Sequence, residues 1–435
     1  MDTFHIDGGR RLEGSIRVNG SKNAALPQMA AALLSDGTVT LRDVPDLADT
    51  RSMMKLLDEL GCEVVASEPG SSERVLSLKV VDRNASHARY DIVRTMRASI
   101  SVLGPLLARR GRARVAMPGG CAIGERPVDL HLHGLAALGA EIELDAGDIV
   151  ATAPRGRLRG NTIFLGGAMG STVLGTANVM SAAVLAEGTT VIESAACEPE
   201  IADLARLLNA MGARITGAGT PRVVIEGVEE LSGAEHRVMP DRIEAGTFMC
   251  AAAITNGSLS IENTPLDAML AVVERLAELG VNIEPLDRTD PQRATCRVTS
   301  ERVLRPIRVT AQPYPGFPTD LQAQLMALLC LAEGNSIVTD KVFPERFLHV
   351  AELSRMGARL HREGATVMVT GVRELRGAPV MASDLRASAS LVLAGLAAQG
   401  HTVVNRVYHL DRGYERFEER LVRLGASIRR VPDSD

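Results

Sequence analysis

A single cysteine, Cys121, lies in a polar, glycine-rich stretch where a thiol is unusual. The sequence MPGGCAIGERPVDLH, residues 117–131, places it after two glycines and shortly before Arg126. Free cysteine usually behaves as a small buried hydrophobe, whereas a nearby guanidinium favours the reactive thiolate. We therefore interpret Cys121 as a functional thiol on a loop, and we predict that Cys250 and Cys330, which stand in apolar segments, are core residues.

Lysine and arginine recur at predicted helix starts, where a positive charge is unfavourable by roughly 0.3 to 1 kcal/mol. These cations are Lys22 in SKN, Arg97 in TMRAS, Arg242 in DRIE and Arg386 in DLRAS. The free N–H groups of a helix start, joined by Lys or Arg, form a cradle for phosphate or carboxylate. The recurrence indicates an anion site, although any one of these cations taken singly could be a surface side chain.

Polar residues beside these cations are expected to cap the helices. We predict that Ser21, Thr95 and Asp384 accept hydrogen bonds from the first free N–H groups of their helices. Asp320 in FPTD allows two interpretations. It is either another cap or a carboxylate that can take a proton from a bound hydroxyl.

Two further loops carry arginine: Arg346 lies in VFPERFLHV, and Arg412 lies in YHLDRGYERFEE, which could also be a solvated helix face. The sequence contains no GxxxxGK[ST] phosphate loop, and GGAMGSTVLG at 166–175 does not fit the dinucleotide fingerprint. We predict that HLH at 131–133 is structural rather than metal-binding. The residues alone thus predict a polyanion-binding α/β enzyme with a loop cysteine and a carboxylate base.

The chain repeats one unit six times. Each copy closes with a predicted helix, a Leu-Gly or Met-Gly step and a short strand; the closing glycines, 68 to 78 residues apart, are Gly61, Gly139, Gly212, Gly280, Gly357 and Gly425. Each copy opens with an Ala/Leu-rich helix for which we predict a C-terminal glycine cap; these opening glycines are Gly37, Gly111, Gly188, Gly257, Gly334 and Gly400. Strands and helices alternate in every copy, which predicts an α/β protein with mixed sheets. From the repeats alone we divide the chain into three plus three copies near residue 235.

Composition narrows the class of ligand and partner. Acids and bases are interspersed and nearly balanced at a net charge of −5, so nothing indicates binding of nucleic acid or of a membrane surface. Aromatic residues make up only 3% and Trp is absent, which argues against stacking as the main recognition device. Six scattered cysteines indicate neither a disulfide framework nor a zinc site, and the first residues lack a signal-peptide pattern. We expect a cytoplasmic protein that binds small molecules.

Taken in order, the motifs make the chain similar to the enolpyruvyl transferase family, in the branch that acts on UDP-N-acetylglucosamine. The resemblance runs nearly end to end, over GSKNAALP, TMRAS, MPGGCAIGERPVDLH, AEGTTVIE, EPEI, MPDRIEAGTF, FPTDLQAQ, RFLHV, ELSRMGA, DLRASASLVLAG and YHLDRGYERFE. It implies an inside-out α/β barrel of two similar domains with three copies each. In that arrangement residues 1–21 join 240–435 in a C-terminal domain, and residues 22–239 form an N-terminal domain that carries the Cys121 loop. Helix starts would face a cleft between the domains, which closes on the sugar nucleotide.

The resemblance also implies a reaction, in which enolpyruvyl passes from phosphoenolpyruvate to the 3-hydroxyl of UDP-N-acetylglucosamine and phosphate is released. This is the first committed step of peptidoglycan synthesis, and it proceeds by addition and elimination without cofactor or metal. The implied catalytic residues are Cys121 as proton donor, Asp320 as base, Lys22 and Arg412. The implied substrate-binding residues are Lys22, Asn23, Arg97, Arg126, Pro127, Val128, Asp129, Leu130, Thr172, Val173, Asp320, Val342, Arg346, Asp384, Arg386 and Arg412. We expect a monomer.

Three positions depart from the family's pattern. The lysine often found before the Ser-Val-Gly step is missing near 170–173, Pro344-Glu345 replaces Glu-Asn, and Ser101 replaces a bulkier aromatic residue. None of these changes removes a catalytic group. Two alternatives stay open: a sister enzyme that uses shikimate 3-phosphate and lacks the PGGC cysteine, and a catalytically silent paralogue that only binds the UDP-sugar.

Overall fold

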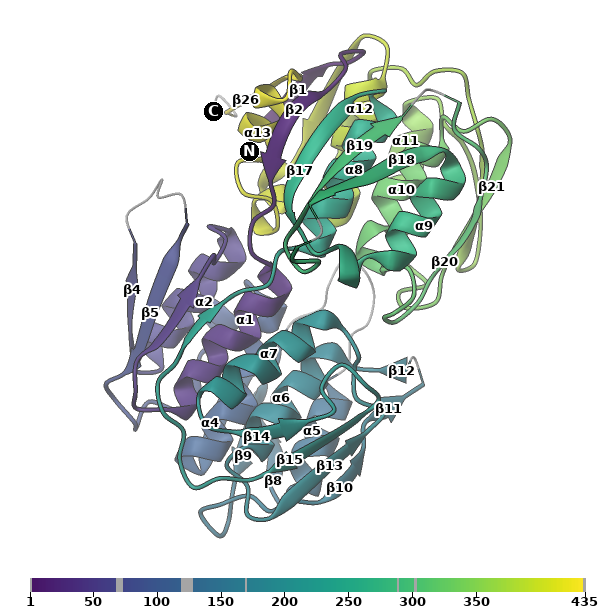
Figure 1. Ribbon diagram of the computed structural model, residues 1–435. Helices are drawn as coiled ribbons and strands as arrows, with labels where there is room; N and C mark the ends of the chain where they lie inside the picture. Colours follow the sequence, from purple (N-terminus) through teal and green to yellow (C-terminus); the bar gives the residue numbers. More distant parts are fainter. Residues whose placement is uncertain are drawn as a thin grey trace. The chain divides into compact units, whose positions relative to one another are not determined.

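The computed structural model describes residues 2–67, 73–118, 128–168, 170–287, 289–300 and 303–432. Cys121, Arg126 and Pro127 therefore lie outside the described residues. Contacts divide the chain into two units, which are described separately (Figure 1). The N-terminal unit contains the described residues between 20 and 239, and the C-terminal unit contains residues 2–19 together with those from 240 onward.

Six four-stranded sheets share one topology, three in each unit. In the N-terminal unit, the first sheet has the strand order β16 (Glu235–Arg237), β3 (Val39–Arg42), β5 (Val75–Val80), β4 (Cys62–Ala66). The second has the order β6 (His87–Ala88), β7 (Arg112–Ala116), β9 (Asp148–Thr152), β8 (Glu141–Asp145). The third has the order β10 (Thr162–Phe164), β13 (Thr189–Glu193), β15 (Arg222–Glu226), β14 (Arg214–Thr216). In the C-terminal unit, the first sheet has the strand order β2 (Glu13–Arg17), β17 (Ser258–Thr264), β19 (Ala294–Ser300), β18 (Val281–Asp287). The second has the order β20 (Arg308–Ala311), β21 (Asn335–Asp340), β23 (Thr366–Thr370), β22 (Arg359–Glu363). The third has the order β24 (Pro379–Met381), β25 (His401–Asn405), β1 (Thr3–Asp7), β26 (Ser427–Val431). In the order given, the first two strands of each sheet are parallel and the later neighbours antiparallel. The six copies and the mixed sheets are confirmed.

One helix of each copy in the C-terminal unit is enclosed along its length with sheets outside it, which is the inverse of an ordinary α/β barrel. The helices of the N-terminal unit are α1 (Lys22–Ala31), α2 (Ala48–Glu59), α3 (Tyr90–Val93), α4 (Leu103–Arg110), α5 (Asp129–Ala137), α6 (Val173–Ala183) and α7 (Pro199–Ala210). Those of the C-terminal unit are α8 (Arg242–Ile254), α9 (Leu270–Leu279), α10 (Gln322–Leu329), α11 (His349–Arg355), α12 (Leu385–Ala397) and α13 (Phe417–Arg423). Short 3₁₀ turns are η1 (Ala32–Leu34), η2 (Arg97–Val102), η3 (Leu266–Ala268), η4 (Thr319–Leu321) and η5 (Val407–Arg412).

The burial of the inner helices follows from their sequences. Every residue of α8 and α10 is buried, and α12 is buried apart from Leu385. A helix that is apolar all round has to be enclosed by other elements. Figure 1 accordingly shows α8, α10 and α12 running through the middle of the C-terminal unit with strands around them. The apolar neighbourhoods of Cys250 and Cys330 are part of this core, where burial raises the pKa of each thiol to about 12.

The two glycine signatures of the repeats serve different purposes. All six closing glycines have positive φ angles, from 76° at Gly61 to 108° at Gly212, and each stands between a helix and the next strand, as a left-handed helix end requires. The predicted caps at the opening glycines are wrong except at Gly111, which ends α4 with φ 67°. At Gly37 a Cβ atom would lie 2.3 Å from the backbone nitrogen of Gly233. Glycine is needed there because another segment approaches closely.

A buried carboxylate joins three parts of the N-terminal unit. Asp203 of α7 accepts hydrogen bonds from Gln28 of α1 at 2.7 Å and from the backbone N–H of Met239 at 3.0 Å. Its other oxygen accepts from Arg206 at 2.8 Å and His236 at 3.0 Å. Burial raises the pKa of Asp203, but the bond from His236 and the other donors outweigh it and lower the pKa overall. The carboxylate thereby fixes the segment that follows β16.

We predict that Asp203→Asn lowers the free energy of unfolding at neutral pH by about 2 to 4 kcal/mol, because donors lose a buried charged acceptor. The folded-state pKa is depressed, so this stabilisation is present above about pH 4 and is lost as the pH falls through the folded-state value. Urea unfolding of wild type and variant between neutral and acidic pH measures it. The difference should shrink towards low pH, and the exposed Asp91→Asn should show none. Equal stability of Asp203→Asn and wild type at neutral pH would contradict the prediction.

Candidate functional site

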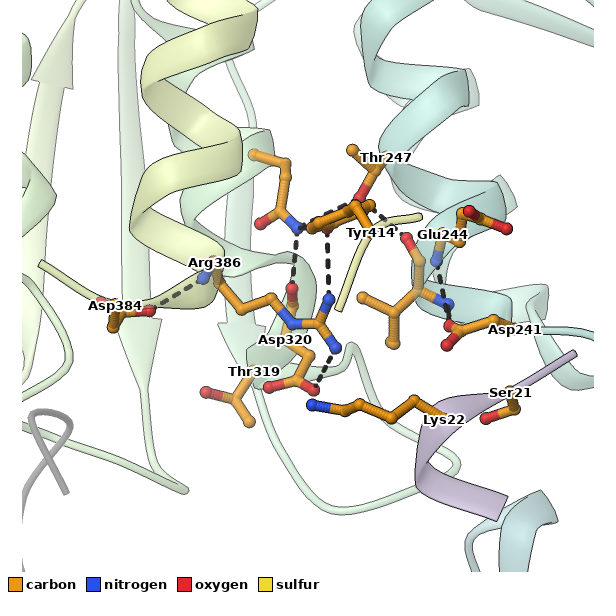
Figure 2. Close-up of polar contacts among 12 residues, drawn as sticks. Ser21, Lys22, Asp241, Glu244, Thr247, Thr319, Asp320, Asp384, Arg386 and Tyr414 are labelled. Carbon is orange, nitrogen blue, oxygen red and sulfur yellow. Dashed lines mark hydrogen bonds and ion pairs between the residues drawn. The ribbon is translucent and has the colours of Figure 1, made fainter. Parts of the chain in front are cut away.

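Asp320 lies between two buried arginines of the C-terminal unit. Its Oδ1 accepts a hydrogen bond from Arg346 Nη1 at 2.7 Å, and its Oδ2 accepts one from Arg386 Nη2 at 3.0 Å; Figure 2 shows the Arg386 contact. The Asp320 side chain is 25% exposed, whereas those of Arg346 and Arg386 are 7% and 3% exposed. Pro318, not Asp320, is the cap residue of η4. The interpretation of Asp320 as a helix cap is therefore wrong. Its carboxylate instead pairs with two arginines.

Arg346 is held by a second set of acceptors. The same Nη1 lies 3.2 Å from Thr319 Oγ1, and the Thr319 hydroxyl donates to Asp340 Oδ2 at 2.6 Å. Asp340 is fully buried, and its other oxygen accepts from the backbone N–H of Val342 at 2.9 Å. One carboxylate at the end of β21 therefore positions both Arg346 and the loop that contains Val342.

Arg386 stands at the start of α12, where the sequence predicted an anion site. The predicted cap Asp384 is confirmed, because its carboxylate accepts from the backbone N–H of Arg386 (Figure 2) and from that of Ala387. Burial alone would lower the pKa of the Arg386 guanidinium, but the facing Asp320 carboxylate outweighs this and raises it. The Arg386 guanidinium is therefore a permanent cation in an interior position.

Two histidines that sequence reasoning did not single out complete this group. His349, at the start of α11, is fully buried, and burial lowers its pKa to about 4, with Asp384 opposing and Arg346 adding to the shift. His409 in η5 has its pKa lowered by burial and by Arg412, while Asp384 opposes. Asp384 therefore acts on both histidines, together with Arg346 at His349 and with Arg412 at His409. The sequence signal was available, since both histidines stand within three residues of an arginine in RFLHV and YHLDR.

In the N-terminal unit, Lys22 is the first residue of α1. The predicted cap Ser21 is confirmed, since its side chain accepts from the backbone N–H of Ala24. Lys22 is only 8% exposed and pairs with Asp49 of α2 at 3.1 Å, while Asn23 is half-buried. The lysine is therefore not a solvated surface side chain.

Arg97 begins the 3₁₀ turn η2, and its neighbour Thr95 behaves differently from the prediction. The Thr95 hydroxyl donates to the backbone carbonyl of Ile92 at 2.7 Å, and the cap position belongs to Met96. The predicted cap at Thr95 is wrong because the hydroxyl closes the preceding turn instead. Arg242, at the start of α8, is buried with its guanidinium 5.8 Å from the centre of the Tyr314 ring.

The remaining predicted substrate contacts of the described N-terminal unit lie at the starts of α5 and α6. Val128 is buried before α5, Asp129 is exposed and Leu130 half-buried. Thr172 caps α6 by accepting from the N–H of Gly175, and Val173 follows it. The preceding glycines form a small hairpin of β11 (Gly166–Gly167) and β12 (Gly170–Ser171).

His131 of the HLH motif is buried and in contact with a side-chain amide. Its Nδ1 lies 3.0 Å from the Asn178 amide nitrogen, and the same amide donates to the Ile100 carbonyl at 2.8 Å. Within the described ranges, no group of three or more His, Cys, Asp or Glu side chains is placed to hold a metal ion. Nor does any helix in that part of the chain have the length and apolar character needed to cross a membrane.

The arrangement in the C-terminal unit can bind an anion and accept a proton. Arg346 and Arg386 flank Asp320, and the charge of Arg412, like that of Asp384 at the start of α12, acts on His409. A guanidinium has five donors, so each arginine can hold Asp320 and an incoming phosphate or carboxylate together. Cys121 and Arg126, predicted for the same chemistry, lie outside the described residues.

Comparison with known proteins agrees with this chemistry. A sequence profile of the family described as EPSP synthase (3-phosphoshikimate 1-carboxyvinyltransferase) matches residues 6–421. A protein of Anaeromyxobacter sp. (strain Fw109-5) named UDP-N-acetylglucosamine 1-carboxyvinyltransferase is 54% identical over 430 residues, which is 99% of each chain. One of the same name from Rhodospirillum centenum is 52% identical over the full length of both.

Solved structures agree on the fold. The enolpyruvyl transferase NikO from Streptomyces tendae superimposes with a TM-score of 0.87 at 27% identity, covering 99% of both chains. EPSP synthase from Acinetobacter baumannii gives a TM-score of 0.76 at 20% identity, covering 99% of this chain and 100% of that one. The inside-out α/β fold expected from the sequence is confirmed. The chain belongs to the enolpyruvyl transferase family, the family of EPSP synthase and of the UDP-N-acetylglucosamine 1-carboxyvinyltransferases.

Proposed function

We propose that this protein transfers enolpyruvyl from phosphoenolpyruvate to the 3-hydroxyl of UDP-N-acetylglucosamine and releases phosphate, an early step of bacterial cell-wall synthesis. The observation that carries the proposal is the Asp320 carboxylate held between Arg346 and Arg386. The name shared by relatives about half identical over the whole length supports the sugar nucleotide as acceptor.

The chemistry requires cations and a proton acceptor in one place. Phosphoenolpyruvate carries a phosphate and a carboxylate, and the sugar nucleotide adds a diphosphate, so their approach has to be compensated by positive charge. In the addition step, the sugar oxygen bonds to C2 of phosphoenolpyruvate, its proton passes to Asp320, and a proton is delivered to the methylene carbon. In the elimination step, the new methyl group loses a proton and the bond from C2 to the phosphate oxygen breaks, which releases phosphate and restores the double bond.

The proposal gives each residue a role in binding a substrate or in moving a proton. Lys22, Arg126, Arg346, Arg386 and Arg412 hold phosphoenolpyruvate; Asn23 and Arg97 contact substrate nearby; and Arg126, Pro127, Val128, Asp129, Leu130, Thr172, Val173 and Val342 contact the sugar nucleotide. Cys121 delivers the proton to the methylene carbon, from a loop that closes over the substrate. Asp384 acts from its place as the cap of α12, where it sets the position of Arg386.

Further features of the proposal concern the whole molecule. Residues 1–21 with 240–435 and residues 22–239 would be the two domains, and both contribute to one reaction. The protein would act in the cytoplasm as a monomer and without a cofactor, since the proton transfers and the bond changes need only side chains and the two substrates.

The two alternatives are less well supported. The names of the similar relatives do not favour shikimate 3-phosphate as acceptor, although the family profile takes its description from that enzyme. A silent UDP-sugar binder was motivated by Pro344 and the 166–175 region. In the structure Glu345 pairs with Arg362 at 2.8 Å, and Arg346 still meets Asp320, so the replaced dipeptide leaves that ion pair in place.

We predict that the purified protein releases phosphate from phosphoenolpyruvate when UDP-N-acetylglucosamine is added, and not when shikimate 3-phosphate is added. A phosphate-release assay with each acceptor separates the three candidates. Turnover with shikimate 3-phosphate alone would establish the sister activity, and silence with both acceptors, together with binding of the UDP-sugar, would establish the binder.

Asp320→Asn should lower kcat by about a hundredfold to ten-thousandfold, because the amide cannot accept the hydroxyl proton. Affinity for UDP-N-acetylglucosamine, measured by titration calorimetry, should persist. Asp91→Asn serves as the matched control with wild-type turnover. If the Asp320→Asn variant turns over like wild type, Asp320 is not the base.

Cys121 should be alkylated by fosfomycin, an epoxide mimic of phosphoenolpyruvate, since the epoxide reacts with a thiolate. Mass spectrometry of the digested protein locates the adduct, and Cys121→Ala should abolish both adduct and turnover while keeping sugar-nucleotide affinity. An adduct on another cysteine, or full turnover of the Cys121→Ala variant, would remove Cys121 from its role.

A further inference from the structure

The Tyr414 hydroxyl lies at the centre of a buried polar network beside Arg386 (Figure 2). Tyr414 is 1% exposed, and its oxygen lies 3.2 Å from Arg386 Nη1, 3.1 Å from Gln324 Nε2 and 2.8 Å from Thr247 Oγ1. The four residues come from four segments, namely the chain after η5, α12, α10 and α8. None of Tyr414, Gln324 and Thr247 belongs to the residues assigned to substrate or catalysis above.

Hydrogen-bond chemistry gives this network a single direction. Arg386 and the Gln324 amide nitrogen can only donate, so the Tyr414 oxygen accepts from Arg386, while the Gln324 amide donates to the pair of hydroxyls, lying 3.1 Å from the Tyr414 oxygen and 3.2 Å from Thr247 Oγ1. The one hydroxyl proton of Tyr414 must then go to Thr247. The Thr247 hydroxyl in turn donates to the backbone carbonyl of Ile243, at 2.8 Å in the same helix. Hydrogen bonds are therefore donated from Arg386 to Tyr414, from Tyr414 to Thr247 and from Thr247 to the Ile243 carbonyl. Each of the two hydroxyl protons has a single acceptor.

The network also reaches Asp320. Gln324 Nε2 donates to the backbone carbonyl of Asp320 at 3.0 Å, while the Asp320 carboxylate accepts from Arg386 Nη2 at 3.0 Å. Arg386 is thus fixed at both terminal nitrogens, one on Asp320 and one on Tyr414. Because the guanidinium is planar, two fixed nitrogens determine the plane in which its other donors can meet a ligand.

From this geometry we infer that Tyr414, supported by Thr247, is a positioning residue for phosphoenolpyruvate that acts through Arg386. Its hydroxyl turns the guanidinium so that the remaining donors face the anionic substrate. The kinetic consequence rests on the proposed function. Burial raises the pKa of Tyr414, although Arg386 opposes this, which is consistent with a hydroxyl that keeps its proton for Thr247.

The test compares variants that remove only a hydroxyl. Tyr414→Phe should raise KM for phosphoenolpyruvate by about tenfold to a hundredfold, the range expected when a bond to a charged group is lost, and leave KM for UDP-N-acetylglucosamine unchanged. Thr247→Val, which keeps the side-chain shape, should move KM in the same direction, and Thr247→Ser, which keeps the hydroxyl, should restore it. Tyr90→Phe, at an exposed tyrosine of the N-terminal unit, is the control. A merely structural role would reduce the active fraction, and hence kcat, without changing KM.

A second measurement does not depend on turnover. The guanidinium N–H signals of Arg386, assigned in the NMR spectrum by their loss in Arg386→Lys, should be sharp in wild type and Thr247→Ser and broadened in Tyr414→Phe and Thr247→Val. Wild-type KM together with sharp signals in both Tyr414→Phe and Thr247→Val would overturn the inference. An inactive wild type would overturn the proposed function alone, and the NMR comparison would still decide the role of Tyr414. If Tyr414→Phe fails to fold, the pair Thr247→Val and Thr247→Ser decides it.

Discussion

Burying a guanidinium requires acceptors for its donors, and the C-terminal unit is organised around this requirement. Arg346 and Arg386 are almost completely removed from water, at a desolvation cost that only a well-placed counter-charge can offset. Asp320 supplies one oxygen to each arginine, which makes a single carboxylate the shared partner of two cations. Without Asp320, both buried guanidinium groups would lose their carboxylate partner at once. The position of this carboxylate is therefore set by electrostatics before any substrate arrives.

The inside-out architecture explains why polar chemistry collects at helix starts. An inner helix such as α8 or α12 is enclosed along its length, so charged side chains in its middle would be buried without partners. The free N–H groups of its first turn can bind a carboxylate or another anion, and that anion can also pair with a cation placed there. Asp384 and Arg386 at α12, and Ser21 and Lys22 at α1, both follow this pattern. The fold thus determines which positions of the repeat can carry chemistry, and the copies differ in what they place there.

Local patterns were therefore predictable from the sequence, and long-range ones were not. The closing glycines predicted six helix ends because a left-handed residue is a local requirement. The cap predicted at Gly37 is wrong, because its reason is the approach of Gly233, almost two hundred residues away. The cap predicted at Thr95 is wrong because the hydroxyl donates to the Ile92 carbonyl and closes the preceding turn. Asp320 remained ambiguous from sequence alone, since its partner Arg346 stands 26 residues further along the chain and its partner Arg386 comes from the next copy. The hydrogen bonds among Tyr414, Gln324 and Thr247 also join residues from different copies, so no local sequence pattern predicts them.

The neutral state of His349 is a condition for this arrangement. The imidazole is interior, between the influence of Asp384 and that of Arg346, and burial holds its pKa at about 4. A proton there at neutral pH would add a positive charge that burial and the charge of Arg346 both disfavour. Its Nε2 has no hydrogen-bond partner among the described residues, which leaves burial as the dominant influence on its charge. An uncharged His349 therefore adds no further positive charge to the surroundings of Arg346, which already shares the single carboxylate of Asp320 with Arg386.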